Sequence, residues 1–239
     1  MSVKSPLISI ITVSYNAIEE IENAIKGIFN QTFIDYEFII IDGGSTDGTT
    51  DILKLYSDRI TYWVSEPDHG IYDAMNKAIL KAKGQYIYFI GADDVFIDAA
   101  VLEKVSHYLV DSEKVYYGDV RFKKRDMIYD GKFNAIKLVT RNISHQSIFY
   151  PAGIFDTFTF NTEYKIFADY DLNLRLYNHP VYSFEYIPLT VALFNDEGAS
   201  GSNTQDLRFE ADRLKIIKSH FPYWVYLYRL FRTKLSKLK

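Results

Sequence analysis

The feature that most constrains the fold is the alternation of short apolar runs with helical patterns through the first half of the chain. The four apolar runs are residues 7–13, 36–41, 60–64 and 86–90. Each run ends in a polar loop, and apolar residues then recur at spacings of three and four, as at Ile18, Ile21 and Ile25. Strands that alternate with helices in this way form an open, right-handed, mostly parallel sheet covered by helices. The sequence therefore predicts an α/β fold.

One edge of this sheet is expected to gather the polar loops. The loops after the four strands contain Tyr15, Asp42, Asp68 and Asp93. In open α/β sheets, ligands bind in the crevice outside the carboxyl ends of the strands. These four loops are therefore predicted to form one ligand site.

Asp93 and Asp94 are adjacent carboxylates that directly follow a buried apolar run and a glycine. Two carboxylates at the end of a buried strand repel each other, and a divalent cation between them and an anionic ligand removes that repulsion. Hard oxygen ligands suit Mg²⁺ or Mn²⁺. The pair therefore indicates a metal site, while the alternative is that these residues cap a following helix.

Two familiar nucleotide-binding motifs are absent. Residues 43–48 have the glycine spacing of a P-loop, but Thr49 and Thr50 stand where Lys and then Ser or Thr are required. No Gly-x-Gly-x-x-Gly follows the first apolar run, so the phosphate turn of dinucleotide-binding folds is excluded. A diphosphate bound here would need a cation, with ligands from Asp93 and Asp94.

Charge is unevenly distributed along the 239 residues. The net charge is −4, but eight Lys or Arg and no acid lie from Arg213 to the end, which leaves −12 on residues 1–212. An acidic body argues against nucleic acid as a partner. The chain has no Cys, no run of 18 apolar residues and no signal-peptide pattern, so we expect a cytoplasmic protein without disulfides or a membrane span.

Three motifs, at residues 8–16, 41–48 and 91–94, together resemble the nucleotide-binding half of the family-two glycosyltransferases. The resemblance covers about residues 7–195 and implies the GT-A fold, a Rossmann-like, mostly parallel sheet flanked by helices with a smaller acceptor-side region. It also implies an inverting transfer of a sugar from a nucleoside diphosphate donor, foremost a UDP-sugar, with Mn²⁺ or Mg²⁺.

The resemblance implies roles for the loop residues. Tyr15 would stack near the uracil, and Asp42 would bind the base or ribose. Asp93 would reach the ribose, and Asp94 would hold the metal. Two alternatives stay open: Tyr15 as a packed aromatic under its loop, and Asp42 as a turn or helix cap.

Residues 68–77 resemble a subgroup whose members build capsule, exopolysaccharide and lipopolysaccharide chains. Many members have an Arg that helps to bind the donor where this chain has Met75. Asp68, Asp73 or Lys77 would have to compensate, and Asp73 is the candidate donor contact. The alternative for Asp73 and Lys77 is an ion pair within one helix, since they are four residues apart.

The second half of the chain contributes two further candidates by the same resemblance. His145, followed by a Gln as in the subgroup, would contact the diphosphate, the metal or the acceptor. Asp169 would be the catalytic base, although Ala168 stands where the family usually has Glu. The alternatives are a structural His145 and an Asp169 that caps a helix over residues 170–177, with Asp171 as a second candidate base.

We expect one GT-A domain over residues 1–212, with a nucleotide-binding half at 1–119 and an acceptor half at 120–212. The loop at 197–203 would be either a lid over the donor or a connector. The basic tail at 213–239 has an apolar helical stripe. The residues of the stripe are Trp224, Leu227, Tyr228, Phe231, Leu235 and Leu238. Such a helix would lie on an anionic membrane near a lipid-linked glycan, or pack on the domain or on a homodimer partner.

Two functions are consistent with these residues. The first is a glycosyltransferase that extends a saccharide or lipid-linked saccharide in bacterial surface polysaccharide synthesis, working in the cytoplasm or at the cytoplasmic face of the membrane. The second is a catalytically degenerate subunit that binds nucleotide or glycan. A nucleotidyltransferase would need a basic, glycine-rich triphosphate loop near the first strand, and the sequence has none.

Overall fold

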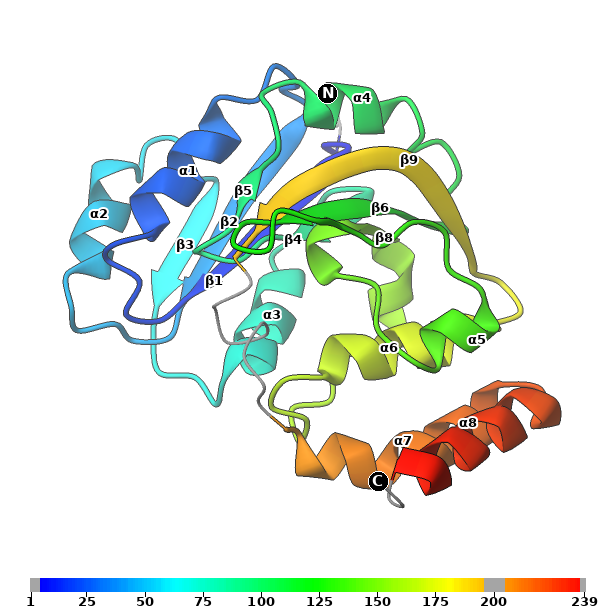
Figure 1. Ribbon diagram of the computed structural model, residues 1–239. Coiled ribbons are helices and arrows are strands. Elements are labelled where there is room, and N and C mark those ends of the chain that lie inside the picture. The colour runs from blue at the N-terminus through cyan, green and yellow to red at the C-terminus, as the bar shows by residue number, and fades with distance from the viewer. Residues whose placement is uncertain (1–4, 196–204, 237–239) are drawn as a thin grey trace.

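The computed structural model describes residues 5–195 and 205–236, and the strands among them join in one curled sheet (Figure 1). The strands are β1 (Ile8–Ser14), β2 (Tyr36–Asp42), β3 (Tyr62–Ser65), β4 (Tyr86–Phe89), β5 (Val95–Phe96), β6 (Lys114–Phe122), β7 (Ile128–Tyr129), β8 (Ile148–Pro151) and β9 (Ser183–Phe194). Their order across the sheet is β3-β2-β1-β4-β8-β6-β9-β5, and β7 pairs with β6. The predicted mixture of a central sheet and flanking helices is confirmed.

Helices cover both faces of the sheet (Figure 1). They are α1 (Ile21–Phe29), α2 (Thr49–Leu55), α3 (Ile71–Ile79), α4 (Val101–Ser106), α5 (Ala135–Leu138), α6 (Ala168–Leu176), α7 (Leu207–His220) and α8 (Tyr223–Ser236), with short 3-10 helices at His145–Ser147 and Ala152–Asp156. The side chains of α1, α2 and α4 pack on one face, and those of α3 and α6 on the other. Among the described residues, no helix is long and apolar enough to cross a membrane.

The central strands are apolar along their whole length because both of their faces are buried. In β2, Phe38 and Ile40 pack toward α1, whereas Ile39 and Ile41 pack toward α3. Alternate residues of a strand point to opposite faces, so a strand between two helical layers needs apolar side chains throughout. This explains why the sequence shows continuous apolar runs.

The four strands β3, β2, β1 and β4 are parallel, as the sequence predicts. Ser14 at the end of β1 lies opposite Asp42 at the end of β2, and Asp42 lies opposite Ser65 at the end of β3. The carboxyl ends of these strands are therefore level, and the loops that follow them meet at one edge.

The second half of the sheet is mixed. The strand β8 is antiparallel to both β4 and β6, while β9 is parallel to β6 and antiparallel to β5. Strand β5 begins one residue after Asp94, and α4 does not begin until Val101. The alternative that the acidic pair caps a following helix is therefore wrong.

Gly84 lies between α3, which ends at Ile79, and β4, which begins at Tyr86. A side-chain carbon at Gly84 would lie 2.4 Å from the backbone nitrogen of Ser9 in β1. Gly84 is thus needed for a close approach of two backbone segments. Its own N–H donates to Ser9 Oγ at 2.8 Å.

Candidate active site

The acidic pair lies just beyond the end of β4 and is held by residues from distant segments. Asp94 is 1% exposed, and its Oδ1 accepts a hydrogen bond from the backbone N–H of Asn195 at 2.8 Å. Its Oδ2 accepts from Nε2 of Gln146 at 2.8 Å, and Asn195 Nδ2 donates to Asp93 Oδ2 at 3.0 Å. Asn195 directly follows β9, so the pairing of β9 with β5 brings it to the acidic pair.

The carboxylates of Asp93 and Asp94 converge beside Gly91. A side-chain carbon at Gly91 would lie 2.7 Å from Asp94 Oδ2 and 2.9 Å from Asp93 Oδ1, so both oxygens face the same point. Burial, together with the charge of Asp93, raises the pKa of Asp94 to about 6. Converging carboxylates, of which that of Asp94 is buried, fit a cation of the Mg²⁺ or Mn²⁺ type, which commonly takes one or two carboxylates and completes its shell with substrate phosphate and water.

Among the described residues, no group of three or more His, Cys, Asp or Glu is arranged to hold a metal ion. A cation at Asp93 and Asp94 would therefore need most of its ligands from a bound phosphate and from water. Such a cation would bind together with a diphosphate rather than in an all-protein cage.

A hollow of about 570 Å³ lies between the loops that follow β1, β2 and β3. Tyr15 lines it and is 67% exposed, which rules out the alternative of a packed aromatic. Asp68 accepts the backbone N–H of Gly70 with Oδ1 at 2.8 Å, and its Oδ2 lies 2.5 Å from where a side chain at Gly43 would begin. The absence of a side chain at Gly43 therefore lets a ring and a carboxylate share this hollow.

Asp42, in contrast, is fully buried and organises the loops. Its carboxylate accepts hydrogen bonds from the hydroxyls of Ser14, Ser45 and Ser65 and from the backbone N–H groups of Gly44 and Ser45. Burial opposes the charged form, but these hydrogen bonds outweigh it and lower the pKa of Asp42. This geometry agrees with the turn-forming alternative, and Asp68 is the carboxylate that faces the hollow.

Asp169 lies in the first turn of α6 and is 5% exposed. Its Oδ1 accepts from the Tyr72 hydroxyl at 2.9 Å and from the next backbone N–H at 2.8 Å. Its Oδ2 accepts from Asn142 Nδ2 at 2.8 Å and lies 3.3 Å from His145 Nδ1. Phe167 is the N-cap, and three of the four partners of the Asp169 side chain lie outside α6, so the simple capping alternative for Asp169 is wrong.

His145 stands between the two acidic sites. With Gln146 it lines a hollow of about 420 Å³ on the side of Asp93 and Asp94, and another of about 350 Å³ on the side of Asp169. Burial disfavours the imidazolium, but the hydrogen bond to Asp169 and the charges of the three carboxylates outweigh it and raise the pKa of His145. The charged imidazole is thus favoured where the two hollows meet.

The hollow on the side of Asp169 has a different lining from those beside the acidic pair and Tyr15. Its aromatic side chains are Phe122, Tyr129, Phe167 and Phe194. Arg125 and Arg141 also line it, whereas no Lys or Arg among the described residues lines either of the other two hollows. Aromatic faces and hydrogen-bonding groups suit a saccharide.

Three candidates from the sequence lie away from these hollows or only border them. Asp73 is engaged with Lys77 at 3.5 Å and with the backbone N–H of His69 at 3.0 Å, which agrees with the intrahelical alternative. Met75 is buried and lines the hollow beside the acidic pair. Asp171 pairs with Arg175 at 2.9 Å and lines a separate surface depression, so it is not close enough to replace Asp169.

Four residues of the site were not predicted from the sequence. They are Tyr72, Asn142, Gln146 and Asn195. Gln146 had a signal, since it directly follows His145 in the motif. Asn195 had none, because nothing in the sequence indicated β9 or its pairing with β5. The segment 197–203, predicted to be a lid or a connector, lies outside the described residues.

The curled sheet with helices on both faces agrees with the GT-A fold that the sequence predicts. Residues 9–194 match the model of "Glycosyl transferase family 2", and the chain therefore belongs to this glycosyltransferase family. A "PGL/p-HBAD biosynthesis glycosyltransferase" of Mycobacterium bovis is 33% identical over 212 residues, which are 86% of this chain and 83% of that protein. A "Putative teichuronic acid biosynthesis glycosyltransferase TuaG" of Bacillus subtilis is 42% identical over 92 residues, which are 37% of this chain and 36% of that protein.

Solved structures share the fold at low sequence identity. Residues 1–349 of S. aureus TarS, in complex with UDP-GlcNAc, match with a TM-score of 0.69 and 16% identity over 94% of this chain and 72% of that one. The longer TarS chain matches at 0.67 and 15%, and this chain covers 42% of it. A mannosyltransferase from Pyrobaculum calidifontis, in complex with GDP-Man and Mn²⁺, matches at 0.67 and 18% over 91% of this chain and 63% of that one.

Proposed function

We propose that this glycosyltransferase moves a sugar from a nucleoside diphosphate donor, foremost a UDP-sugar, to a saccharide or lipid-linked saccharide, with inversion and with Mn²⁺ or Mg²⁺. The observation that carries the proposal is the division of the cleft by His145 and Gln146. Converging carboxylates of Asp93 and Asp94 lie on one side, and the buried carboxylate of Asp169 lies on the other. Donor and acceptor would therefore each have a hollow, with a carboxylate suited to each.

Donor binding would use the two hollows beside the parallel strands. The exposed ring of Tyr15 offers a face for the base, and Asp68 Oδ2 can accept from an N–H of the base or a ribose hydroxyl. Asp93 and Asp94 would hold the cation, which when bound supplies positive charge against the diphosphate leaving group. The complexes of fold neighbours with UDP-GlcNAc, and with GDP-Man and Mn²⁺, support this class of donor.

Asp169 would accept the proton of the acceptor hydroxyl as that oxygen attacks the anomeric carbon. Tyr72 and Asn142 fix the carboxylate at short distances, and His145 lies beside it. The 3.3 Å contact with His145 is the weakest of these, so it is the one that an acceptor hydroxyl would replace. A single displacement of this kind inverts the anomeric centre.

The acceptor would be part of a bacterial surface polysaccharide, and the enzyme would work in the cytoplasm at the membrane face. Relatives named as glycosyltransferases of teichuronic acid and PGL/p-HBAD biosynthesis support a biosynthetic role. The aromatic hollow beside Asp169 is compatible with a saccharide. The competing function, a subunit that binds nucleotide or glycan without turnover, rests on Ala168 and on the buried Met75 in place of Arg.

The test is calorimetric titration of UDP, GDP and dTDP, each with Mn²⁺ and with chelator. Wild type, Asp94→Ala and Asp169→Asn would be compared. We expect one nucleotide to bind wild type and Asp169→Asn equally in Mn²⁺, and to lose at least tenfold in affinity with chelator or in Asp94→Ala. Equal binding with and without cation in all three proteins would contradict the donor site.

A further inference from the structure

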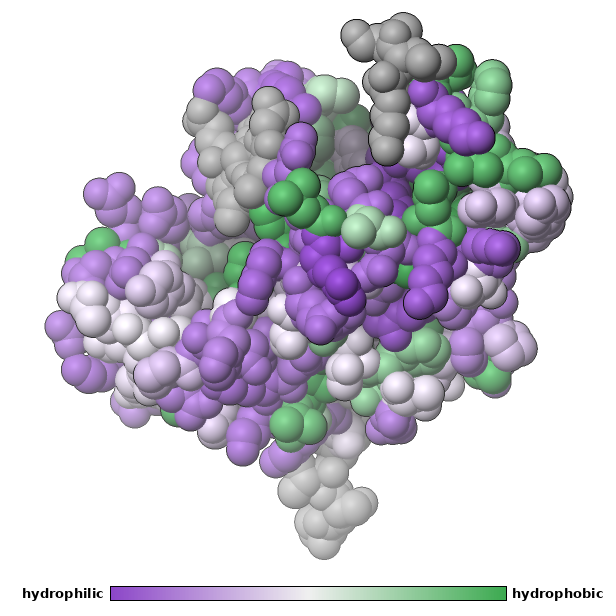
Figure 2. Space-filling view, turned by 90° about the horizontal axis from the view of Figure 1, so that it is seen from below, coloured by the Kyte–Doolittle hydropathy of each residue, from purple (hydrophilic) through white to green (hydrophobic). Residues whose placement is uncertain are grey.

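The outer face of α8 is an exposed apolar stripe. The large apolar residues on it are Tyr223, Trp224, Leu227, Phe231 and Leu235, which are 44–65% exposed. Their spacing of three or four residues places them on one side of the helix. Val225, on the opposite side, is fully buried against the domain. In Figure 2, which views the molecule from the side of α7 and α8, hydrophobic side chains gather at the upper right of the surface.

Cationic side chains of α8 border this stripe, and Tyr223–Ser236 contains no acidic residue. Arg232 and Lys234 are exposed, and their positions on the helical wheel flank Trp224 and Phe231 on either side. From Arg213 onward the sequence has eight Lys or Arg and no Asp or Glu, while residues 1–212 carry −12. The tail is therefore a local region of positive charge on an acidic protein.

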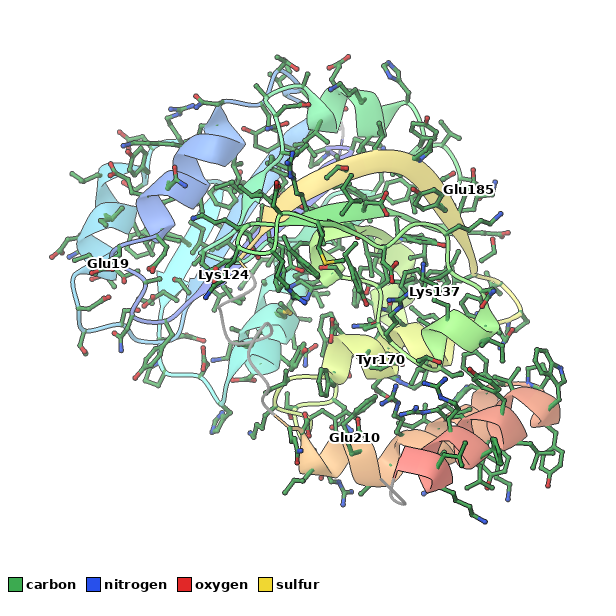
Figure 3. The ribbon with its side chains drawn as sticks, in the orientation of Figure 1. Glu19, Lys124, Lys137, Tyr170, Glu185 and Glu210 are labelled. Carbon is green, nitrogen blue, oxygen red and sulfur yellow. The ribbon has the colours of Figure 1, made fainter. Side chains whose placement is uncertain are left out.

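The helix pair α7 and α8 is firmly attached to the acceptor half. Arg213 of α7 is 7% exposed and donates to the Tyr170 hydroxyl at 2.7 Å and to the carbonyl oxygen of Thr140 at 3.0 Å. Asp206, the N-cap of α7, accepts the backbone N–H of Ile166 at 3.0 Å, three residues before Asp169. Tyr170 lies on α6, above the C-terminal pair (Figure 3). The stripe therefore points outward from the part of the molecule that contains the hollow beside Asp169.

Two occupants fit an exposed apolar stripe, and charge decides between them. A symmetric dimer would bring the same patch of both copies together, and α8 has no acidic residue that could pair with Arg232 or Lys234 of the other copy. An anionic bilayer instead offers hydrocarbon to the stripe and negative headgroups to the cations. Trp and Tyr rings also suit the boundary between headgroups and acyl chains.

We propose that α8 is an interfacial helix, which lies in the plane of an anionic membrane with Trp224, Leu227 and Phe231 in the acyl boundary and Arg232 and Lys234 among the headgroups. This binding is a property of the helix and does not depend on sugar transfer. It would hold the acceptor half, rather than the donor half, beside the bilayer. A lipid-linked acceptor would then meet the hollow at Asp169 without leaving the membrane surface.

The test is binding of the full chain to vesicles of phosphatidylcholine with one quarter phosphatidylglycerol, and to vesicles of phosphatidylcholine alone. Sedimentation measures partition. The emission of Trp224, in a Trp63→Phe background that removes the other Trp, measures insertion. We expect binding and a blue shift on anionic vesicles, both weakened by salt, and partition onto neutral vesicles that is at least tenfold lower.

Matched variants distinguish membrane binding by α8 from nonspecific binding through other exposed apolar side chains. The variant Trp224→Ser/Leu227→Ser/Phe231→Ser should lose at least tenfold in partition, as should Arg232→Glu/Lys234→Glu. The control Ile34→Ser/Leu55→Ser/Leu80→Ser removes apolar side chains that are even more exposed but lie elsewhere, and it should bind as wild type does. Since all of these side chains are exposed, thermal unfolding should change little.

Three results would overturn the proposal. They are equal partition of wild type and the α8 variants, equal binding to neutral and anionic vesicles, and a lipid-free dimer that dissociates in the triple α8 variant. The last result would assign the stripe to a second copy. Each result is independent of transferase activity, so failure of the proposed reaction would leave this test unaffected.

Discussion

Replacing Asp94 with Asn is expected to stabilise the cation-free protein while it abolishes activity. Asp94 is 1% exposed, and its pKa is raised from 3.8 to about 6 because the carboxylate is buried and lies beside Asp93. A folded-state pKa above the unfolded value means that the ionised group destabilises the fold. At pH 7 a rise of this size corresponds to roughly 3 kcal/mol.

The Asn side chain keeps the shape and the oxygen that accepts from Asn195, but it loses the charged acceptor for Gln146. That loss should cost about 1–2 kcal/mol. A net gain of about 1–2 kcal/mol in the free energy of unfolding remains at pH 7 in chelator. As the pH falls through 6, the wild-type carboxylate takes up its proton, so the electrostatic part of the gain should fall by roughly half at pH 5.

Urea unfolding followed by circular dichroism at pH 7 and pH 5, in chelator, measures the gain. Asp68→Asn is the control, because this half-buried carboxylate lines the same cleft and its change should stay within about 0.5 kcal/mol. Mn²⁺ should stabilise wild type more than Asp94→Asn, and turnover of the variant should fall by about two decades or more. If Asp94→Asn is less stable than wild type at pH 7 by more than 1 kcal/mol, the reasoning on Asp94 is refuted.

The remaining predictions concern the other carboxylates and the ring. Asp169→Asn should lower kcat by about two decades or more while the donor Kd stays within about twofold, measured by steady-state kinetics and calorimetry; a large loss of donor affinity would instead indicate a structural role. Asp42→Ala leaves five donors, one buried and four part-buried, without their acceptor. It should destabilise the fold by about 3 kcal/mol or more in urea unfolding, whereas Asp68→Ala should not. Tyr15→Ala should weaken nucleotide binding by about tenfold and leave the melting temperature unchanged, and an unchanged Kd would exclude stacking.

The first half of the fold could be predicted because its signals are local. The apolar runs of β1, β2 and β4 reflect burial on both faces, and the helical spacing of α1 follows from packing on one face. The strands β5 and β9 could not be predicted. Their pairing joins Val95 to Leu193, nearly a hundred residues away, and neither strand has a pattern that specifies this partner.

The contrast between local signals and long-range pairing also explains which site residues could be predicted. Residues that follow strand ends, such as Tyr15 and Asp94, could be named because topology alone brings strand ends together. Asp42 organises the loops because it accepts hydrogen bonds from the hydroxyls of Ser14 and Ser65. These residues lie opposite Asp42 on the neighbouring strands, as the register of β1, β2 and β3 dictates. Sequence spacing does not give that register, so the buried carboxylate was expected to face a ligand.

The most direct test of the central claim is turnover of a panel of UDP-, GDP- and dTDP-sugars with nitrophenyl glycoside acceptors, with product and anomeric configuration read by proton NMR. The account predicts that one donor class yields a product of inverted configuration in Mn²⁺. This product should be lost with chelator, in Asp94→Asn and in Asp169→Asn. Transfer that persists in chelator, or in Asp169→Asn, would contradict the assignment of the cation site or of the base.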